Sequence, residues 1–341
     1  MAPEGSAYGQ PWNEKYRPKV ITDVSHQDAV VSTLQEAMKT NNVPHLLFYG
    51  PPGTGKTTTA LAMVQELYGP TLVKSRVMEL NASDERGINV VRHKIKQFAA
   101  TAVGQGAPGY PSPPYKVIIL DESDSMTTDA QNALRRTMEL YTKVTRFVLI
   151  CNYVSRIIEP IASRCAKFRF KPLGEESISD RITSICQKEG VVMEEGAMEA
   201  LGSACGGDMR KAISHLQSAV RLFGNTVRVQ SILEAAGVVP SERVVELLEA
   251  CRGGSYEKAQ DVVVRLTKNG YPALQIIQQL QELVMCAEDV SDDKKARICM
   301  RLAEVDKALI DGSDEMLQLL DCASLAICAF TGTTQVGKYD A

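Results

Sequence analysis

The chain has 341 residues, 44% of them hydrophobic and 23% charged, which is typical of a globular protein with roughly two or three domains. Its net charge of −3 excludes a global basic field, so any nucleic-acid site must be local. We find no apolar run of roughly 18 residues and no secretory signal, so we expect neither a membrane span nor secretion. Nine cysteines without a CxxC pair indicate reduced core thiols of a cytosolic or nuclear protein, not a disulfide framework or zinc site.

Residues 1–10 are small and polar, and we expect no ordered structure there. The next segment, residues 11–18 (PWNEKYRP), is called the leader below and contains the only tryptophan, Trp12. An aromatic segment ahead of a nucleotide fold can pack over adenine. It can equally be a strap that Trp12 attaches to the core, and the residues alone do not decide between these alternatives.

The sequence GPPGTGKT at residues 50–57 matches the phosphate-loop pattern GxxxxGK[ST] at every fixed position. Glycines allow a tight turn that presents backbone N–H groups to phosphate oxygens. Lys56 can then reach the β- and γ-phosphates, and the Thr57 hydroxyl can hold Mg²⁺. A strand over 45–49 and a helix over 57–68, ending at Gly69, give this loop the right context, because the helix N-terminus favours a phosphate. A second amphipathic helix is expected over 27–38.

Further strands are expected over 77–80, 117–120, 146–151 and 167–170. The run 117–120 is typical of a strand buried on both faces, and Asp121 and Glu122 follow it directly. At this position Asp121 would hold the metal, directly or through water, and Glu122 would polarise the attacking water. Asn152, at the end of another strand, could touch the γ-phosphate or bond its own backbone. A capping box at Thr128 opens a helix over 128–141.

A helix over 84–100 has an apolar face and a basic stripe. Val91, Ile95 and Phe98 should face the core. Such a stripe can hold nucleic-acid phosphates, but the residues alone favour an ordinary solvated face. The stripe consists of Arg86, Asn89, Arg92, His93 and Lys96. Residues 103–115, rich in glycine and proline, should form a surface loop.

From residue 172 onward the apolar periodicity is only helical. A small three-helix domain is expected first, with Arg210 at the start of its third helix. About five further helices follow residue 240, and they contain no catalytic constellation. They are therefore either additional core or an assembly surface.

Several motifs together resemble those of AAA+ ATPases: GPPGTGKT, DESD at 121–124, Asn152, SRC at 163–165 and GDMR at 207–210. The segments NASDERG at 81–87 and EKYRP at 14–18 narrow the resemblance to the small subunits of eukaryotic replication factor C, the sliding-clamp loader. The resemblance implies an α/β parallel-sheet AAA+ nucleotide domain over 11–171, a helical lid domain over 172–238 and an all-α collar over 239–331, with a tail over 332–341.

The resemblance also implies a function. The chain would be an ATPase subunit, with ATP and Mg²⁺ as cofactors, in a nuclear heteropentamer that acts in DNA replication and repair. That assembly opens the clamp, proliferating cell nuclear antigen, and loads it on primer–template DNA. Asn152 matches the first sensor and Arg210 the second, whereas Arg164 matches the arginine finger that serves a neighbour's ATP. Two alternatives are a mainly structural ATP-binding subunit and another AAA+ DNA remodeller.

The resemblance reverses the interpretation of the basic stripe, because the family's corresponding helix follows DNA phosphates. The expected DNA contacts are Arg86, Asn89, Arg92 and Lys96. The expected catalytic residues are Lys56, Asp121, Glu122, Asn152, Arg164 and Arg210, with Thr57 and Asp121 as metal ligands. The expected nucleotide contacts are Asn13, Arg17, Ser25, Gly50, Pro51, Pro52, Gly53, Thr54, Gly55, Lys56, Thr57, Thr58, Asn152 and Arg210. The sequence departs from the family pattern at Asn13, usually apolar, and at Ser123, usually alanine.

Overall fold

The computed structural model describes residues 9–23, 27–83, 91–101, 103–104, 106 and 108–332. The side chains of residues 28, 29, 91 and 92 are not described. The chain divides into two compact units, Met1–Val227 and Arg228–Ala341. All sequence-predicted site residues belong to the first unit.

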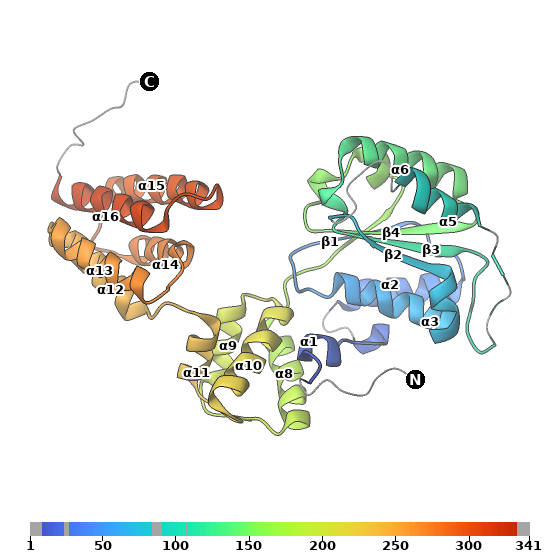
Figure 1. Cartoon of the computed structure of the whole chain (residues 1–341), viewed down its shortest axis with the longest axis horizontal. Helices are drawn as coiled ribbons and strands as arrows, with labels where there is room; N and C mark the ends of the chain where they lie inside the picture. The colour runs from blue at the N-terminus through green and yellow to red at the C-terminus, as the bar shows by residue number, and fades with distance from the viewer. Residues whose placement is uncertain are drawn as a thin grey trace. The chain divides into compact units, whose positions relative to one another are not determined.

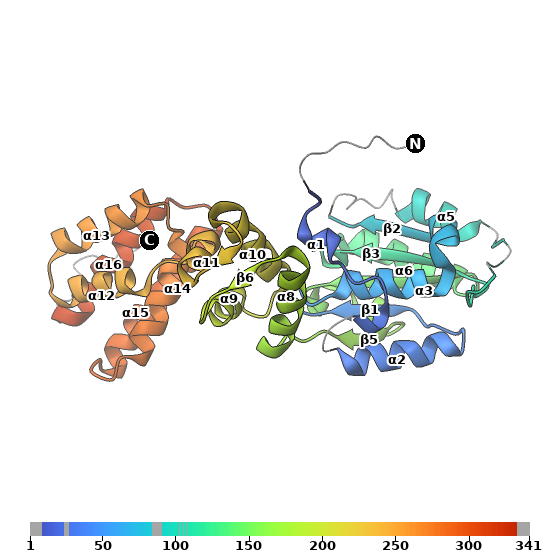
Figure 2. The ribbon, with the colours of Figure 1, turned by 90° about the horizontal axis from the view of Figure 1, so that it is seen from below.

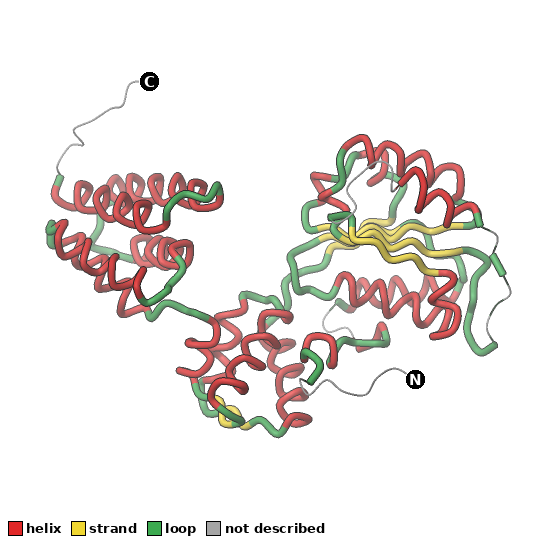
Figure 3. The backbone as a smooth tube through the Cα atoms, viewed as in Figure 1, coloured by secondary structure: helices red, strands yellow, loops and turns green. Residues whose placement is uncertain are grey.

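A five-stranded parallel sheet forms the centre of the first unit, with the strand order β2-β3-β4-β1-β5 (Figures 1 and 2). Each strand falls on a segment predicted as a strand from the sequence, and Figure 3 shows the strands gathered in one layer. The strands are β1 (Leu46–Tyr49), β2 (Val77–Asn81), β3 (Lys116–Asp121), β4 (Thr145–Cys151) and β5 (Ala166–Arg169).

Helices cover both faces of this sheet (Figure 1). One face packs against α2 (Asp28–Lys39) and α3 (Lys56–Arg76), and the other against the π-helical turn Val91–Ile95, α5 (Lys96–Ala100) and α6 (Thr128–Tyr141). Along β3, Val117 and Ile119 belong to the first core, and Ile118 and Leu120 to the second. The prediction that this strand is buried on both faces is confirmed.

The helix that follows the phosphate loop continues beyond its predicted end. Gly69 has φ 66° and ψ 170°, which are not helical, so the predicted end is a break inside α3. Pro70 begins the second helical segment, because its fixed φ and missing N–H suit the first position of a helix. Of the predicted helix over 84–100, residues 84–90 lie outside the described residues.

The predicted capping box at the start of α6 is wrong. Thr127, not Thr128, caps the helix, and its Oγ1 accepts a hydrogen bond from the N of Ala130 at 3.3 Å. Gln131 instead bonds to a different part of the chain: its Nε2 donates to the Arg156 carbonyl at 3.0 Å, and its Oε1 accepts from the N of Ile158 at 2.9 Å. Gln131 therefore attaches α6 to the segment that precedes α7 (Glu159–Ala162).

The remainder of the first unit contains the three predicted helices, α8 (Glu175–Glu189), α9 (Ala197–Cys205) and α10 (Met209–Phe223). Gly190, Gly206 and Gly224 end them with positive φ. The expectation of helices alone is wrong, because β6 (Val192–Met193) and β7 (Thr226–Val227) form a short parallel pair. Two-residue strands are too short to produce a detectable alternation in sequence.

The second unit is all-helical and has a core of its own. The five helices predicted after residue 240 are present, and α11 (Val229–Ala236), which precedes them, was not predicted. They are α12 (Ser241–Arg252), α13 (Tyr256–Lys268), α14 (Ala273–Cys286), α15 (Asp292–Ile310) and α16 (Glu315–Thr331). Within the described residues, no helix combines the length and the apolar content needed to cross a bilayer.

All nine cysteines are free, as expected. Six are buried in the cores, but Cys286 is exposed and Cys299 and Cys328 are partly exposed, so the description as core thiols applies to six. Burial raises the pKa of Cys151 and of Cys165 to about 12, which makes these two thiols poor nucleophiles.

His45 gives the first unit a pH-dependent stability. The imidazole is only 8% exposed, and its Nδ1 accepts a hydrogen bond from the N of Phe147 at 3.1 Å. Burial, followed by the positive charge of Arg146, lowers the pKa of His45 to about 4. Because this native pKa lies below the unfolded value, the unfolded chain binds the extra proton. The contribution to stability is therefore complete above about pH 6.5 and lost as the pH falls through about 4.

We expect the free energy of unfolding to lose up to about 3 kcal/mol through this group on acidification. His45→Asn, which keeps an acceptor for the N of Phe147, should have a flatter pH dependence in urea unfolding followed by circular dichroism. His93→Asn, at an exposed position, is the control and should retain the wild-type slope. Equal slopes for wild type and His45→Asn would contradict the assignment.

Candidate nucleotide-binding site

The phosphate-loop lysine is held by the loop itself. Lys56 is 7% exposed, and its Nζ donates to the carbonyl oxygens of Gly50 at 2.8 Å and Pro51 at 2.7 Å. It also donates to Oδ1 of Asn152 at 3.0 Å. Burial lowers the pKa of Lys56, and the charge of Asp121 opposes that effect. The ammonium group is therefore fixed between the loop and the end of β4.

Two oxygen atoms that suit a divalent cation lie beside the loop. The Thr57 hydroxyl donates to Oδ2 of Asp121 at 2.7 Å, and Oδ1 of Asp121 accepts from the N of Glu122 at 2.9 Å. Among the described residues, no group of three or more His, Cys, Asp or Glu side chains could hold a metal ion. This donor set fits Mg²⁺, which is usually bound through one or two carboxylates together with substrate phosphates.

The acidic turn after β3 also positions Asn152. Oδ2 of Asp124 accepts hydrogen bonds from the backbone N of Asn152 and of Tyr153, each at 3.2 Å. Glu122 has φ 51° and ψ 38°, a left-handed conformation that is uncommon for a residue with a side chain and is concentrated at functional sites. Ser123, where the family pattern has alanine, is buried and donates to the Leu120 carbonyl at 2.7 Å. The serine that replaces the usual alanine at position 123 therefore has a partner for its buried hydroxyl group.

Asp208, which belongs to the GDMR motif but was not predicted as a site residue, lies directly against the phosphate loop. Asp208 caps α10, and its Oδ1 accepts from the N of Arg210 at 2.8 Å and the N of Lys211 at 3.1 Å. Gly53 has φ 70°, and a Cβ placed there would lie 1.8 Å from that same Oδ1. Gly53 is therefore required both by its backbone conformation and by the proximity of the lid.

The leader contacts the lid through a short helix, α1 (Trp12–Lys15). The N of Trp12 donates to Oε1 of Gln217 at 3.1 Å, and Nδ2 of Asn13 donates to Oγ of Ser214 at 2.8 Å; both acceptors are on α10. The two alternatives for the leader, packing over adenine and a strap attached to the core, both stay predictions. Tyr16 and Arg17 of the leader line the cavity described below, whereas Trp12 does not, and its backbone N is bonded to α10.

A second set of contacts joins the leader to α8. Oε1 of Glu189 accepts from Nζ of Lys15 at 2.7 Å and from the Tyr16 hydroxyl at 2.6 Å. These two hydrogen bonds, that of Lys15 first, lower the pKa of Glu189. Arg181 donates to the Tyr16 carbonyl. The leader is therefore attached to two helices of the lid.

These parts enclose one cavity of about 320 Å³. Its lining includes unpredicted leader and lid residues, among them Tyr16, Arg181 and Met209. Gly50 and Pro51 contribute their carbonyl groups to Lys56, and Ser25 lies outside the described residues. The predicted residues that line the cavity are Asn13, Arg17, Pro52, Gly53, Thr54, Gly55, Lys56, Thr57, Thr58, Asp121, Glu122, Asn152 and Arg210.

Arg164 is the one predicted catalytic residue that does not line this cavity. It follows α7, and its side chain is 40% exposed. One guanidinium nitrogen lies 2.7 Å from Oε1 of Glu139 on α6, and the other donates to the Pro160 carbonyl.

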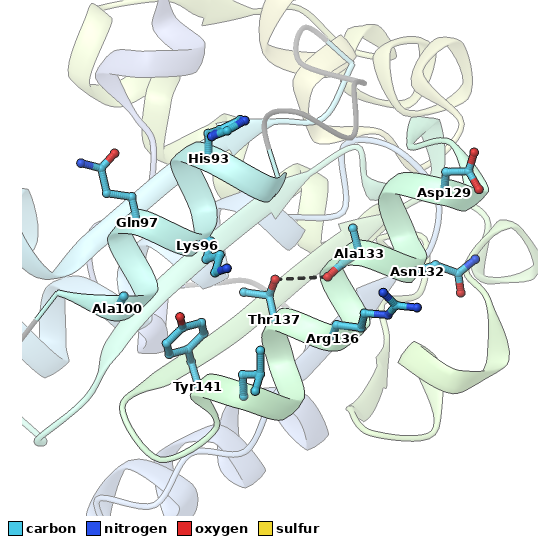
Figure 4. A pocket seen from close by; sticks show the side chains of 11 residues that line it. His93, Lys96, Gln97, Ala100, Asp129, Asn132, Ala133, Arg136, Thr137 and Tyr141 are labelled. Carbon is cyan, nitrogen blue, oxygen red and sulfur yellow. Dashed lines mark hydrogen bonds between the residues drawn. The ribbon is translucent and has the colours of Figure 1, made fainter.

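A second cavity of about 920 Å³ lies between α5 and α6 (Figure 4). Lys96 lies in its wall as an exposed cation, and Arg136 of α6, which was not predicted, contributes another. Of the remaining predicted DNA contacts, Arg86 and Asn89 lie outside the described residues, as does the Arg92 side chain. The full lining is His93, Lys96, Gln97, Ala100, Asp129, Asn132, Ala133, Arg136, Thr137, Leu140 and Tyr141.

Comparison with known protein families matches residues 46–173 to the ATPase family associated with various cellular activities (AAA). Residues 239–324 match the replication factor C C-terminal domain. The chain is 59% identical over 329 residues to replication factor C subunit 4 of Arabidopsis thaliana, covering 96% of this chain and 97% of that protein. The chain belongs to the replication factor C subunit family.

Both subunit 2 and subunit 4 of replication factor C from other organisms are similar to this chain. Subunit 2 of Oryza sativa subsp. japonica is 58% identical, with 94% of this chain and 95% of that protein covered. Human subunit 4 is 51% identical, and the match covers 92% of this chain and 87% of that protein. The resemblance inferred from residues 50–57, 81–87 and 121–124 is thereby confirmed for the family.

The fold extends to more distant AAA+ proteins. The Holliday junction branch migration motor RuvB of Thermotoga maritima superposes with a TM-score of 0.50 at 16% identity, covering 69% of this chain and 78% of that one. At that identity the similarity concerns the fold alone. The parallel-sheet AAA+ fold class predicted for this replication factor C subunit is confirmed, as is the presence of an ATPase domain.

We expect Gly53→Ala to weaken ATP binding at least about tenfold, because the added methyl group meets Asp208 and the left-handed φ is strained. Adding Asp208→Ser should restore part of the affinity, since serine is shorter but still caps α10. Gly202→Ala, where nothing lies within 4 Å of the new Cβ, is the control and should bind ATP normally. Calorimetric titration with ATP measures all four proteins. No recovery in the double variant would contradict contact between the lid and the loop as the cause.

Proposed function

We propose that this replication factor C subunit binds ATP with Mg²⁺ and uses its hydrolysis to help open a sliding clamp and load it on primer–template DNA. The observation that supports this function best is that two hydrogen-bonded pairs, Lys56 with Asn152 and Thr57 with Asp121, line one cavity. The clamp is proliferating cell nuclear antigen, the assembly is a heteropentamer of replication factor C subunits, and the location is the nucleus. The lid comprises residues 172–238 and the collar residues 239–331.

Each group in the cavity has a distinct role in this proposal. Lys56 binds the β- and γ-phosphates, and Asn152 reports the γ-phosphate to the acidic turn through Asp124. Thr57 and Asp121 would hold Mg²⁺, which, when bound, neutralises charge on the phosphate oxygens. Glu122 polarises the attacking water, and Arg210 couples the lid to the nucleotide.

Arg164 acts in trans on the ATP of the neighbouring subunit. Its position outside the chain's own cavity and its exposure support this role, because a finger must reach across an interface. An arginine finger is typically worth roughly 10³–10⁵ in kcat, so hydrolysis would depend on assembly. A mainly structural subunit is the weaker alternative, since both Glu122 and Arg164 are present.

The second cavity, between α5 and α6, supports contact with DNA and is called the groove below. Lys96 and Arg136 in its wall are suited to backbone phosphates, and such contacts position a duplex without reading its sequence. Arg86, Asn89 and Arg92 belong to the same proposal. The alternative of another AAA+ DNA remodeller has only the similarity of fold in its favour.

ATP turnover of the assembled complex, measured with DNA and clamp present, tests the catalytic roles. Lys56→Ala should abolish hydrolysis at this subunit's own site, and Arg164→Ala should slow the neighbour's site by roughly 10³-fold or more. Lys39→Ala, which removes only an exposed pair with Glu36, is the control. The isolated chain should be nearly inactive. The proposal is wrong if neither active-site variant slows the stimulated turnover.

The salt dependence of DNA binding by the complex tests the groove. Lys96→Ala and Arg136→Ala should each weaken binding to any duplex sequence and reduce the slope of log K against log salt by about 0.9. Lys268→Ala, at an exposed position in the second unit, is the control and should leave the slope unchanged. Unchanged slopes for both groove variants would exclude the groove from DNA contact.

A further inference from the structure

The backbone that carries Arg164 is fixed, so only its side chain remains to be positioned. The N of Arg164 donates to the Ile161 carbonyl at 3.0 Å, and Cys165 next to it is buried. The N of Ala166 then donates to the His45 carbonyl at 2.8 Å as β5 begins. A free arginine side chain loses rotamer entropy when it is held in one conformation. A finger that is not held in advance would lose this entropy in the transition state.

Two acceptors from different elements hold the guanidinium. Oε1 of Glu139, on α6, lies 2.7 Å from one terminal nitrogen, and the Pro160 carbonyl, on α7, accepts from the other. A planar group attached at two separate nitrogens has its direction fixed as well as its place. The guanidinium has five N–H donors, so donors remain for phosphate oxygens.

Glu139 is paired with Arg164 although other arginines are closer in sequence. Arg135 and Arg136 precede it by one helical turn, where a glutamate on a helix commonly finds its partner. The structure instead pairs its carboxylate with Arg164, beyond the end of α7. The opposite face of α6, with Ala130, Leu134 and Met138, is buried in the core, so the carboxylate is supported by a fixed helix.

Stability does not account for this pair. The two side chains are 40% and 43% exposed, and exposed ion pairs contribute little to the free energy of unfolding. What the pair does determine is where the guanidinium lies before a neighbouring subunit arrives. We infer that Glu139 is a positioning residue for the finger Arg164, so that this subunit presents a preorganised guanidinium to the neighbour's ATP. The inference rests on the proposed role of Arg164.

The inference predicts a specific kinetic effect on kcat and KM. Because the finger stabilises charge that develops in the transition state, loss of Glu139 should lower kcat and leave the KM for ATP unchanged. Glu139→Ala in the assembled complex should reduce kcat roughly 5- to 10-fold. Glu139→Gln keeps an oxygen acceptor of the same length and should recover part of that loss. In the Arg164→Ala background, Glu139→Ala should have no further effect.

Glu159→Ala is the matched control. It removes a carboxylate from the same surface, but Glu159 faces Lys167 at 3.9 Å and not Arg164. Its stimulated turnover should equal that of wild type. An equal loss in this control would assign the effect to general surface charge and would overturn the inference.

The remaining outcomes distinguish a failure of the positioning role of Glu139 from a failure of the proposed finger role of Arg164. Normal turnover in Arg164→Ala would overturn the finger, and the inference with it. A slow Arg164→Ala beside a normal Glu139→Ala would overturn the inference alone. A loss of kcat from Glu139→Ala that persists in the Arg164→Ala background would also overturn the inference. A rise in kcat in Glu139→Ala would overturn it as well, because it would mean that Glu139 holds the finger away from the neighbour's ATP.

Discussion

Neighbouring parallel strands end at one edge of the sheet, and the site depends on that arrangement. The order β3-β4-β1 brings together Asp121, Asn152 and the start of the phosphate loop, although they are far apart in sequence. Lys56 connects the loop to the end of β4, because it donates hydrogen bonds both to the loop carbonyl groups and to Asn152. A shift of one residue in the register of β4 would turn its core side chains to the opposite face of the sheet and separate these groups. The cores on both faces thus maintain the geometry of the site.

The residues of this edge could be predicted because phosphate chemistry allows few alternatives. A tight loop needs glycine, a triphosphate needs a lysine, and a metal needs an acid after a buried strand. The elements around them could be predicted because strands buried on both faces have long apolar runs. These two signals predicted the central strands and nearly all of the cavity's phosphate side, whereas β5 was predicted from the alternation of Lys167, Phe168, Arg169 and Phe170.

The rest could not be predicted, because it consists of contacts between distant segments that follow no periodicity. Nothing in the sequence relates Asp208 to Gly53, or Asn13 to Ser214, and each contact exists only once the chain has folded. The capping box was wrong because Thr127 and Thr128 both suit an N-cap. In the structure Thr127 is the cap, and Gln131 bonds to the segment before α7 instead of capping its own helix.

The attachment of the leader to α8 and α10 has a consequence for the shape of the cavity. Residues of the leader and of α10 line the same cavity as the phosphate loop, and the leader is bonded to α8 and α10. The leader and the two helices are therefore bound to one another on one side of the cavity. Any displacement of α8 and α10 from the phosphate loop would move the leader residues that line the cavity as well.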